Sequence, residues 1–320
     1  MARAAGTGIL SIIRNEPKEP DLTERFITNG TVELWTEEFG DPAHPPVLLV
    51  PGSMASGITW PDALVGRLAA GGRRVIRYDH RDTGRSSTLD FDAAPYTWTD
   101  LKDDLLAVVD GYGLDAVHLV GHSAGGVLAQ WVAAEHPERV LTLTTVGSSP
   151  LGAGEGRTIM NALTGQAPGP DDLPFPREEF VEFFTGAAVN PPAPDRKSLI
   201  DFAVATARVL HGTALPFDED AERALAEKIF DRARRPGSET NHQRAFAADP
   251  TFEPVDVLGR ITAPTLAIEG TEEPAKPGHS ALIADRVQRG ELFMVEGMGH
   301  MFPAPVHGAV AEAILRHTAR

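Results

Sequence analysis

The residues with the clearest chemical potential surround Ser123, in the segment HLVGHSAGG (118–126). Residues 121–125 (GHSAG) fit the pattern G-x-S-x-G, with an apolar strand pattern before them and a helical pattern after them. A serine on such a sharp strand-to-helix turn presents its hydroxyl to a substrate, and the small flanking residues let neighbouring backbone approach. The N-terminus of the following helix favours negative charge on a developing oxyanion. We therefore predict that Ser123 is a nucleophile.

A serine nucleophile needs a base, and position selects one among eleven histidines. His300 lies in EGMGHMFP (296–303), after a strand pattern and before the last helical pattern, at the sheet edge expected for Ser123. There it can accept the serine proton and return it to a leaving group. We expect the other histidines to be structural, although three of them are alternatives that could border the pocket: His211, His242 and His279.

The third catalytic group should be an acid that orients the base, on the loop after the penultimate strand. That loop lies in IEGTEEPAKP (268–277), which contains no aspartate. Loops of this kind commonly read G-T-E-D-P, so Glu273 takes the place of the aspartate. Adjacent side chains point to different sides, which leaves Glu272 as an alternative, and both glutamates could instead be solvated. We predict Glu273.

Backbone N–H groups should stabilise the oxyanion. One candidate is the N–H of Ala124, and the second is the N–H of Ser53, in the turn that follows the buried strand pattern PVLLV (46–50). We expect four side chains near these groups to line the substrate pocket, although the first two could equally be core: Met54, Trp60, His122 and Met301.

Strand and helix patterns alternate along most of the chain, which predicts a mostly parallel sheet flanked by helices. Between about 150 and 250 this alternation stops, and apolar residues recur at three- and four-residue intervals, which predicts an inserted helical cap. The expected organisation is an N-terminal arm (1–30), a first core part (31–150), the cap (151–250) and a second core part (251–320). The expected strands cover 31–39, 46–50, 73–79, 116–121, 140–146, 264–270 and 291–297, and the expected core helices cover 60–70, 98–111, 124–135, 278–288 and 306–317.

Composition narrows the possible functions. The 320 residues carry a formal net charge of −16, which argues against nucleic acid or an anionic membrane as a partner. The chain has no cysteine, which excludes disulfides and a thiol nucleophile and fits the cytoplasm. The histidines show no metal-ligand spacing, so we expect no metal. The partner expected is a small-molecule ester, bound by a monomer or a homodimer.

These motifs together resemble the α/β-hydrolase family, over about residues 31–320. Five segments more specifically resemble the aclacinomycin methylesterase group: VELWTEEFGDP, ITWPDALVGRLAAGGRRVIRYDHRDTGRSS, HLVGHSAGG, PTLAIEG and EGMGHMFP. The resemblance implies the α/β-hydrolase fold and cofactor-independent hydrolysis of a methyl ester on a polyketide ring. It also implies Ser123 as nucleophile, His300 as base, and Ser53 and Ala124 as oxyanion donors. Glu273 departs from it, because the group has aspartate there.

The sequence thus predicts a serine hydrolase that cleaves a carboxylic ester through an acyl-enzyme. Two alternatives use the same residues. One is a C–C bond hydrolase or perhydrolase with the same triad, and the other is a ligand-binding protein on this fold that does not turn over.

Overall fold

The computed structural model describes residues 23–248 and 257–319, and within them an eight-stranded sheet crosses the molecule. The strand order is β1-β2-β4-β3-β5-β6-β7-β8. The pairs β1–β2 and β2–β4 are antiparallel, and all the other pairs are parallel. The strands are β1 (Thr23–Asn29), β2 (Val32–Phe39), β3 (Pro46–Val50), β4 (Arg74–Tyr78), β5 (Val117–His122), β6 (Val140–Val146), β7 (Thr265–Gly270) and β8 (Gly290–Val295).

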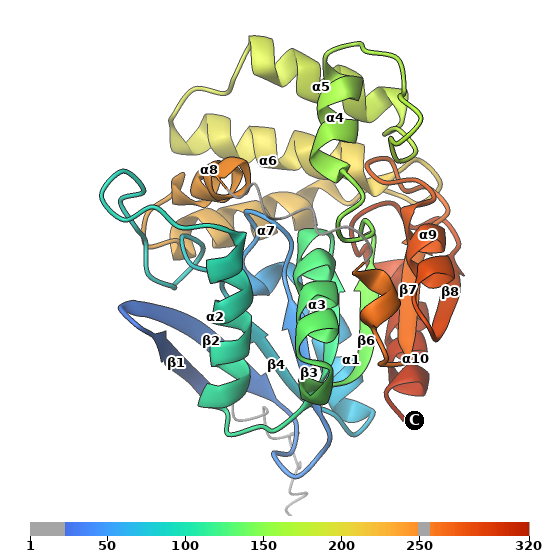
Figure 1. The fold of residues 1–320 in the computed structure, drawn as a ribbon. Helices are drawn as coiled ribbons and strands as arrows, with labels where there is room; N and C mark the ends of the chain where they lie inside the picture. Colours follow the sequence, from blue (N-terminus) through green and yellow to red (C-terminus); the bar gives the residue numbers. More distant parts are fainter. Residues whose placement is uncertain (1–22, 249–256, 320) are drawn as a thin grey trace, which may run out of the picture.

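Helices cover both faces of this sheet, as Figure 1 shows. One face carries α2, α3 and α9, and the other carries α1 and α10. The core helices are α1 (Asp62–Ala70), α2 (Trp98–Gly111), α3 (Ala124–Glu135), α9 (His279–Arg286) and α10 (His307–His317).

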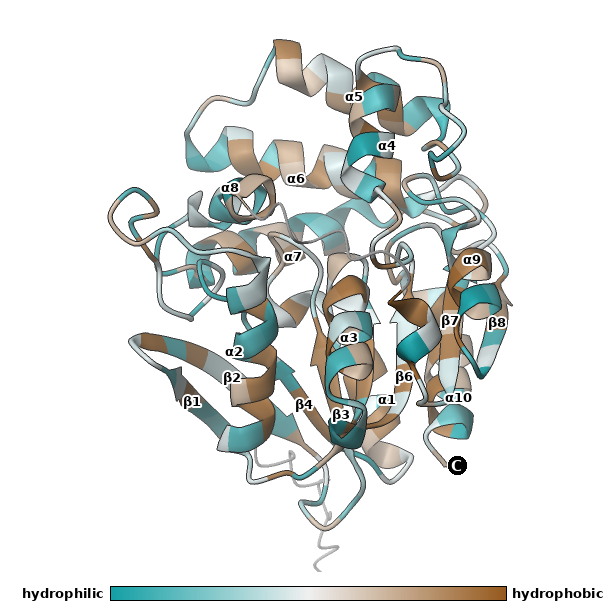
Figure 2. Ribbon diagram, in the orientation of Figure 1, coloured by the Kyte–Doolittle hydropathy of each residue, from teal (hydrophilic) through white to brown (hydrophobic). Residues whose placement is uncertain are grey.

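Alternation along the strands divides the core into two layers. Leu48 and Val50 of β3 join the cluster beneath α2 and α3, whereas Val47 and Leu49 join the cluster beneath α1 and α10. Successive strand residues point to opposite faces, so a parallel strand covered on both sides must be apolar throughout. Helix α2 is amphipathic, and in Figure 2 it carries hydrophilic and hydrophobic stretches side by side, whereas residues 124–133 of α3 are all buried.

Within the described residues, five α-helices fall between β6 and β7, in the segment expected to form an inserted helical cap. They are α4 (Glu155–Leu163), α5 (Glu178–Val189), α6 (Arg196–His211), α7 (Glu219–Arg232) and α8 (Asn241–Ala248). Figure 1 shows them gathered above one end of the sheet. We call residues 155–248 the cap. The last two residues of the predicted 151–250 segment lie outside the described residues.

The expected N-terminal arm needs a correction. Residues 23–29 of the predicted 1–30 arm form β1, which pairs with β2 along its whole length. The sequence TERFITN is largely polar because this strand lies at the edge of the sheet, so the apolar alternation that marks a strand is weak. Residues 1–22 lie outside the described residues.

The two-layer core predicts unequal costs for two leucine truncations. Leu119 of β5 is fully buried, whereas Leu141 of β6 is 45% exposed. We expect Leu119→Ala to lower the free energy of unfolding by about 2–5 kcal/mol, because it leaves a cavity beside the strand that leads to Ser123. Leu141→Ala should cost less than about 1 kcal/mol. Urea denaturation of both variants tests this, and equal costs would contradict the layer assignment.

Candidate active site

Ser123 sits at the junction of β5 and α3 with a left-handed backbone, φ 53° and ψ −123°. Such a conformation is costly for a residue with a side chain, and close packing maintains it here. A Cβ atom on Gly121 would overlap the Gly125 carbonyl, and one on Gly125 would overlap the Pro51 carbonyl. The Ser123 N–H also donates to the carbonyl of Val146, over 2.8 Å. The glycines of the motif are therefore required by contact between β5, α3 and the loop after β3.

His300 and Glu273 lie together at this edge of the sheet. His300 Nδ1 is 2.9 Å from Glu273 Oε2 and 3.0 Å from Oε1. Both side chains are buried, with Glu273 only 1% exposed. Because Glu273 is paired through Nδ1, the remaining ring nitrogen of His300 is left for proton exchange with another group.

The Glu273 carboxylate has further support from its own loop. Its Oε1 accepts hydrogen bonds from the N–H of Ala275 (2.9 Å) and of Lys276 (3.1 Å). Burial acts to raise the pKa of Glu273, but the His300 ring and these hydrogen bonds outweigh it and hold the pKa below its usual value. The group therefore remains ionised at neutral pH and can stabilise a positive imidazole.

Gly147 makes room for this pair. It follows β6 directly, with φ 54°, and a Cβ atom there would lie 2.9 Å from Glu273 Oε2 and 3.1 Å from His300 Nδ1. Gly147 was not among the predicted site residues. Its position one residue after the strand beside β5 is the signal that could have identified it.

Glu272 lies beside Glu273 in the chain but faces the cap. Its Oε2 accepts a hydrogen bond from Thr213 Oγ1 at 3.1 Å and lies 3.8 Å from Arg177 Nη1. Arg177 makes two further hydrogen bonds to this loop. Its Nη2 donates to the Thr271 carbonyl and its backbone N–H donates to the Pro274 carbonyl, each over 2.8 Å.

The two adjacent glutamates thus have different partners. Glu272 helps to fasten the loop to the cap, while Glu273 pairs with His300. Nothing in the local sequence marks Arg177 for this role.

The cap also contacts the loop of the histidine itself. The backbone N–H of His300 donates to the Leu210 carbonyl, at the end of α6, over 2.6 Å. The loop after β8 is thus positioned by an element about ninety residues earlier in the sequence, which no local pattern could have predicted.

The two predicted oxyanion donors lie on the elements expected for them. Ala124 is the first residue of α3. Ser53 lies two residues after Pro51, whose carbonyl packs closely against Gly125. Within the part of the chain that the structure describes, neither N–H donates a hydrogen bond to a protein acceptor.

The four predicted pocket residues differ in exposure. Met54 is 39% exposed and Met301 is half-buried, whereas Trp60 is 1% exposed and stacks on Phe302 within the core. His122 is buried beneath the His300 ring, with 4.8 Å between ring centroids, and its Nε2 donates to the His300 carbonyl over 2.8 Å. Met54 and Met301 are thus partly accessible to solvent, whereas Trp60 and His122 pack among buried side chains.

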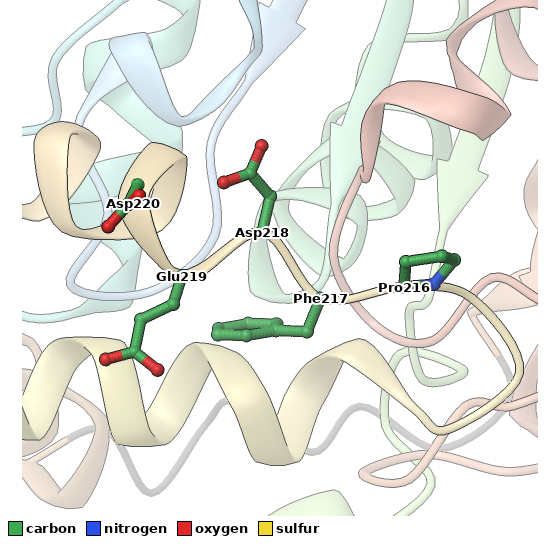
Figure 3. A pocket seen from close by; sticks show the side chains of 5 residues that line it. All are labelled: Pro216, Phe217, Asp218, Glu219 and Asp220. Atoms are coloured by element: carbon green, nitrogen blue, oxygen red, sulfur yellow. The ribbon is translucent and has the colours of Figure 1, made fainter.

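A wide hollow of about 620 Å³ opens elsewhere on the cap, along the segment that leads from α6 to α7. Figure 3 shows its lining residues, Pro216, Phe217, Asp218, Glu219 and Asp220. Phe217 packs against His211, with 5.3 Å between ring centroids. None of the predicted site residues lines this hollow, so it is separate from the serine and histidine described above.

The described residues contain no group of three or more metal-ligating side chains placed to hold an ion. None of their helices has the length and apolar character needed to cross a bilayer.

Comparison with known proteins gives close relatives along nearly the whole chain. Residues 45–303 match the model of a family described as the alpha/beta hydrolase fold. The chain is 38% identical to the rhodomycin D methylesterase DnrP of Streptomyces peucetius, over 93% of this chain and 98% of the relative. It is also 38% identical to the rhodomycin D methylesterase DauP of Streptomyces sp. (strain C5), with the same coverage.

Solved structures agree on the fold. The 2-hydroxy-6-oxo-6-phenylhexa-2,4-dienoate hydrolase (BphD) of Rhodococcus sp. strain RHA1 superposes with a TM-score of 0.71 at 17% identity, covering 94% of this chain and all of that one. The esterase EaEST of Exiguobacterium antarcticum gives 0.70 at 18% identity, covering 93% of this chain and all of that one. At such identities the likeness shows the fold alone.

The burial of His122 predicts a measurable loss of stability in acid. Burial lowers its pKa from 6.5 to about 3, so the folded protein keeps the ring neutral while the unfolded chain protonates it below about pH 6.5. Its contribution is therefore complete above pH 6.5 and decreases as the pH falls toward 3, by about 1.4 kcal/mol at pH 5.5.

We expect His122→Gln, which retains a donor for the His300 carbonyl, to lose about that much less stability than the parent protein between pH 7.5 and 5.5. Urea denaturation at the two pH values measures the difference. Identical pH dependence in the two proteins would show that His122 is not held neutral.

Proposed function

Because the chain belongs to the α/β-hydrolase family, we propose that it is a cofactor-independent serine esterase that cleaves the methyl ester of a polyketide-like molecule. The observation that carries the proposal is the pairing of His300 with the buried, ionised Glu273, beside a serine in a left-handed turn. Methylesterases with 38% identity over nearly their whole length favour an ester over the other reactions of this fold.

In this reaction Ser123 Oγ attacks the ester carbonyl while His300 takes its proton. Glu273 accepts the Nδ1–H hydrogen bond and stabilises the positive ring. The N–H groups of Ser53 and Ala124 bind the oxyanion of the tetrahedral intermediate. His300 then donates its proton to the departing methoxide, which leaves as methanol, and an acyl-enzyme remains.

Water completes the cycle. His300 removes a proton from a water molecule, which attacks the acyl carbonyl through a second tetrahedral intermediate. The Ser123 oxygen leaves with the proton from His300, which regenerates the enzyme and releases a carboxylic acid that loses its remaining proton to solvent. Neither half-reaction in this proposal uses a metal ion or a cofactor.

The glutamate in place of aspartate fits this mechanism. Glutamate is one methylene longer, and its carboxylate occupies the space left open at Gly147. The two amide hydrogen bonds from Ala275 and Lys276 fix the longer side chain in a single position. The extra rotational freedom of glutamate is thereby removed in the folded state.

A burst experiment tests the proposed nucleophile. In a stopped-flow assay with p-nitrophenyl acetate, we expect a burst of one equivalent of p-nitrophenol followed by steady release, because acylation and deacylation are separate steps. Ser123→Ala should abolish both phases. A Ser123→Ala protein that still gives a burst would exclude Ser123 as nucleophile, and a parent burst without turnover would indicate a ligand-binding protein.

Substitution of the two glutamates should reduce activity to very different extents. Glu273→Gln should lower kcat on the order of 10⁴-fold, because the amide cannot stabilise the positive His300 ring. Glu272→Gln, which removes only the ion pair with Arg177, is the matched control and should retain most of the activity. Steady-state kinetics of the two variants separate the assignments, and a larger loss in Glu272→Gln would transfer the role to that residue.

A further inference from the structure

A cap histidine contacts the loop that carries Ser53. His242 lies on α8, is 1% exposed, and belongs to no part of the reaction described above. Its Nδ1 accepts a hydrogen bond from the backbone N–H of Met54, over 2.9 Å. Nδ1 accepts, so Nε2 carries the proton, and it donates to the Arg81 carbonyl over 2.9 Å. Both ring nitrogens are thus used, one on each of two core loops.

The loop contacted by His242 has an unusual backbone. The N–H of Ala55 donates to the Gly52 carbonyl over 3.2 Å, which closes a four-residue turn. Met54, its third residue, has φ 61°, a value that turns of this kind normally assign to glycine or asparagine. Methionine is unfavourable there, so the turn needs an external contact to hold it. The hydrogen bond from Met54 to His242 is such a contact.

The other end of the loop is held by a second histidine. His80 Nε2 donates to the Pro51 carbonyl over 2.9 Å, and the His80 and His242 rings meet edge to face, with 5.6 Å between centroids. Burial lowers the pKa of both rings, that of His80 to about 3, so both are neutral at neutral pH. A neutral ring is the form that can accept the Met54 hydrogen bond.

We propose that His242 is a positioning residue, through which the cap holds the turn at residues 52–55 so that the Ser53 N–H faces the oxyanion. The proposal rests on the proposed function, because it assigns importance to Ser53 through the ester reaction. It connects cap helix α8 to the oxyanion site through the hydrogen bond between His242 and Met54.

Four variants separate positioning from simple attachment of the cap. His242→Ala removes both hydrogen bonds. His242→Asn places an acceptor oxygen where Nδ1 now lies, whereas His242→Gln reaches only the Nε2 position. Asn241→Ala is the matched control, since Asn241 Nδ2 on the same helix donates to Asp82 Oδ2 (3.1 Å) and to the Leu89 carbonyl (3.3 Å), both outside the turn.

We expect His242→Ala and His242→Gln to lower kcat about 10- to 100-fold with little change in KM, because a misplaced oxyanion donor weakens the transition state and not the ground state. Inhibition by phenylboronic acid, which forms a tetrahedral adduct with serine, should weaken in parallel. His242→Asn should recover most of kcat, and Asn241→Ala should keep it. A loss in Asn241→Ala equal to that in His242→Ala, or equal recovery by Gln and Asn, would overturn the proposal.

A crystal structure of His242→Ala gives a readout that does not depend on activity. We expect Met54 to leave the positive-φ region in this variant and to keep it in His242→Asn. An unchanged turn in His242→Ala would overturn the inference while leaving the esterase mechanism intact. Failure of the Ser123-dependent burst in the parent protein would instead overturn the proposed function.

Discussion

The left-handed backbone of Ser123 is the constraint around which the rest of the site is arranged. Around that residue β5, α3 and the loop after β3 pack so closely that no side chain fits between them, which explains the glycines at 121 and 125. The same close approach brings the turn at Ser53 next to the start of α3. The Ser123 N–H donates a hydrogen bond to the Val146 carbonyl at the end of β6, and the next residue, Gly147, leaves space for Glu273. One strained residue thus determines which parts of four separate segments meet.

Much of this arrangement follows from the sequence, because it depends on local patterns. The alternation of apolar strands and helices predicts the sheet, and β5, α3 and β6 lie within a residue or so of their expected bounds. His300 and the loop at 271–274 follow strands whose carboxyl ends share one edge, so their proximity is a consequence of parallel topology. The prediction is weaker where the pattern is weak, as at β1, an edge strand with few apolar residues.

The local sequence does not determine which of Glu272 and Glu273 pairs with His300. Adjacent residues of the same type carry the same sequence signal, and their roles diverge only through partners far along the chain. Arg177 and Thr213 of the cap engage Glu272, while Gly147 leaves room for Glu273 beside His300. Those partners are set by tertiary packing, which single-residue propensities do not contain. For the same reason, the contacts of Leu210 with the His300 loop and of His242 with the turn at Ser53 were not predicted.

The bond between the His300 N–H and the Leu210 carbonyl has a consequence for how this enzyme can diverge. An inserted domain that only covers a pocket can be exchanged between relatives as a module. Such an exchange alters substrate specificity and leaves the catalytic reaction unchanged. Here the insertion forms hydrogen bonds with the backbone of the loop at His300, the loop at 271–274 and the turn at Ser53. New specificities should therefore arise by side-chain changes within the existing cap more readily than by recombination of whole caps, since a transplanted cap must reproduce its contacts with all three segments before it can select a substrate.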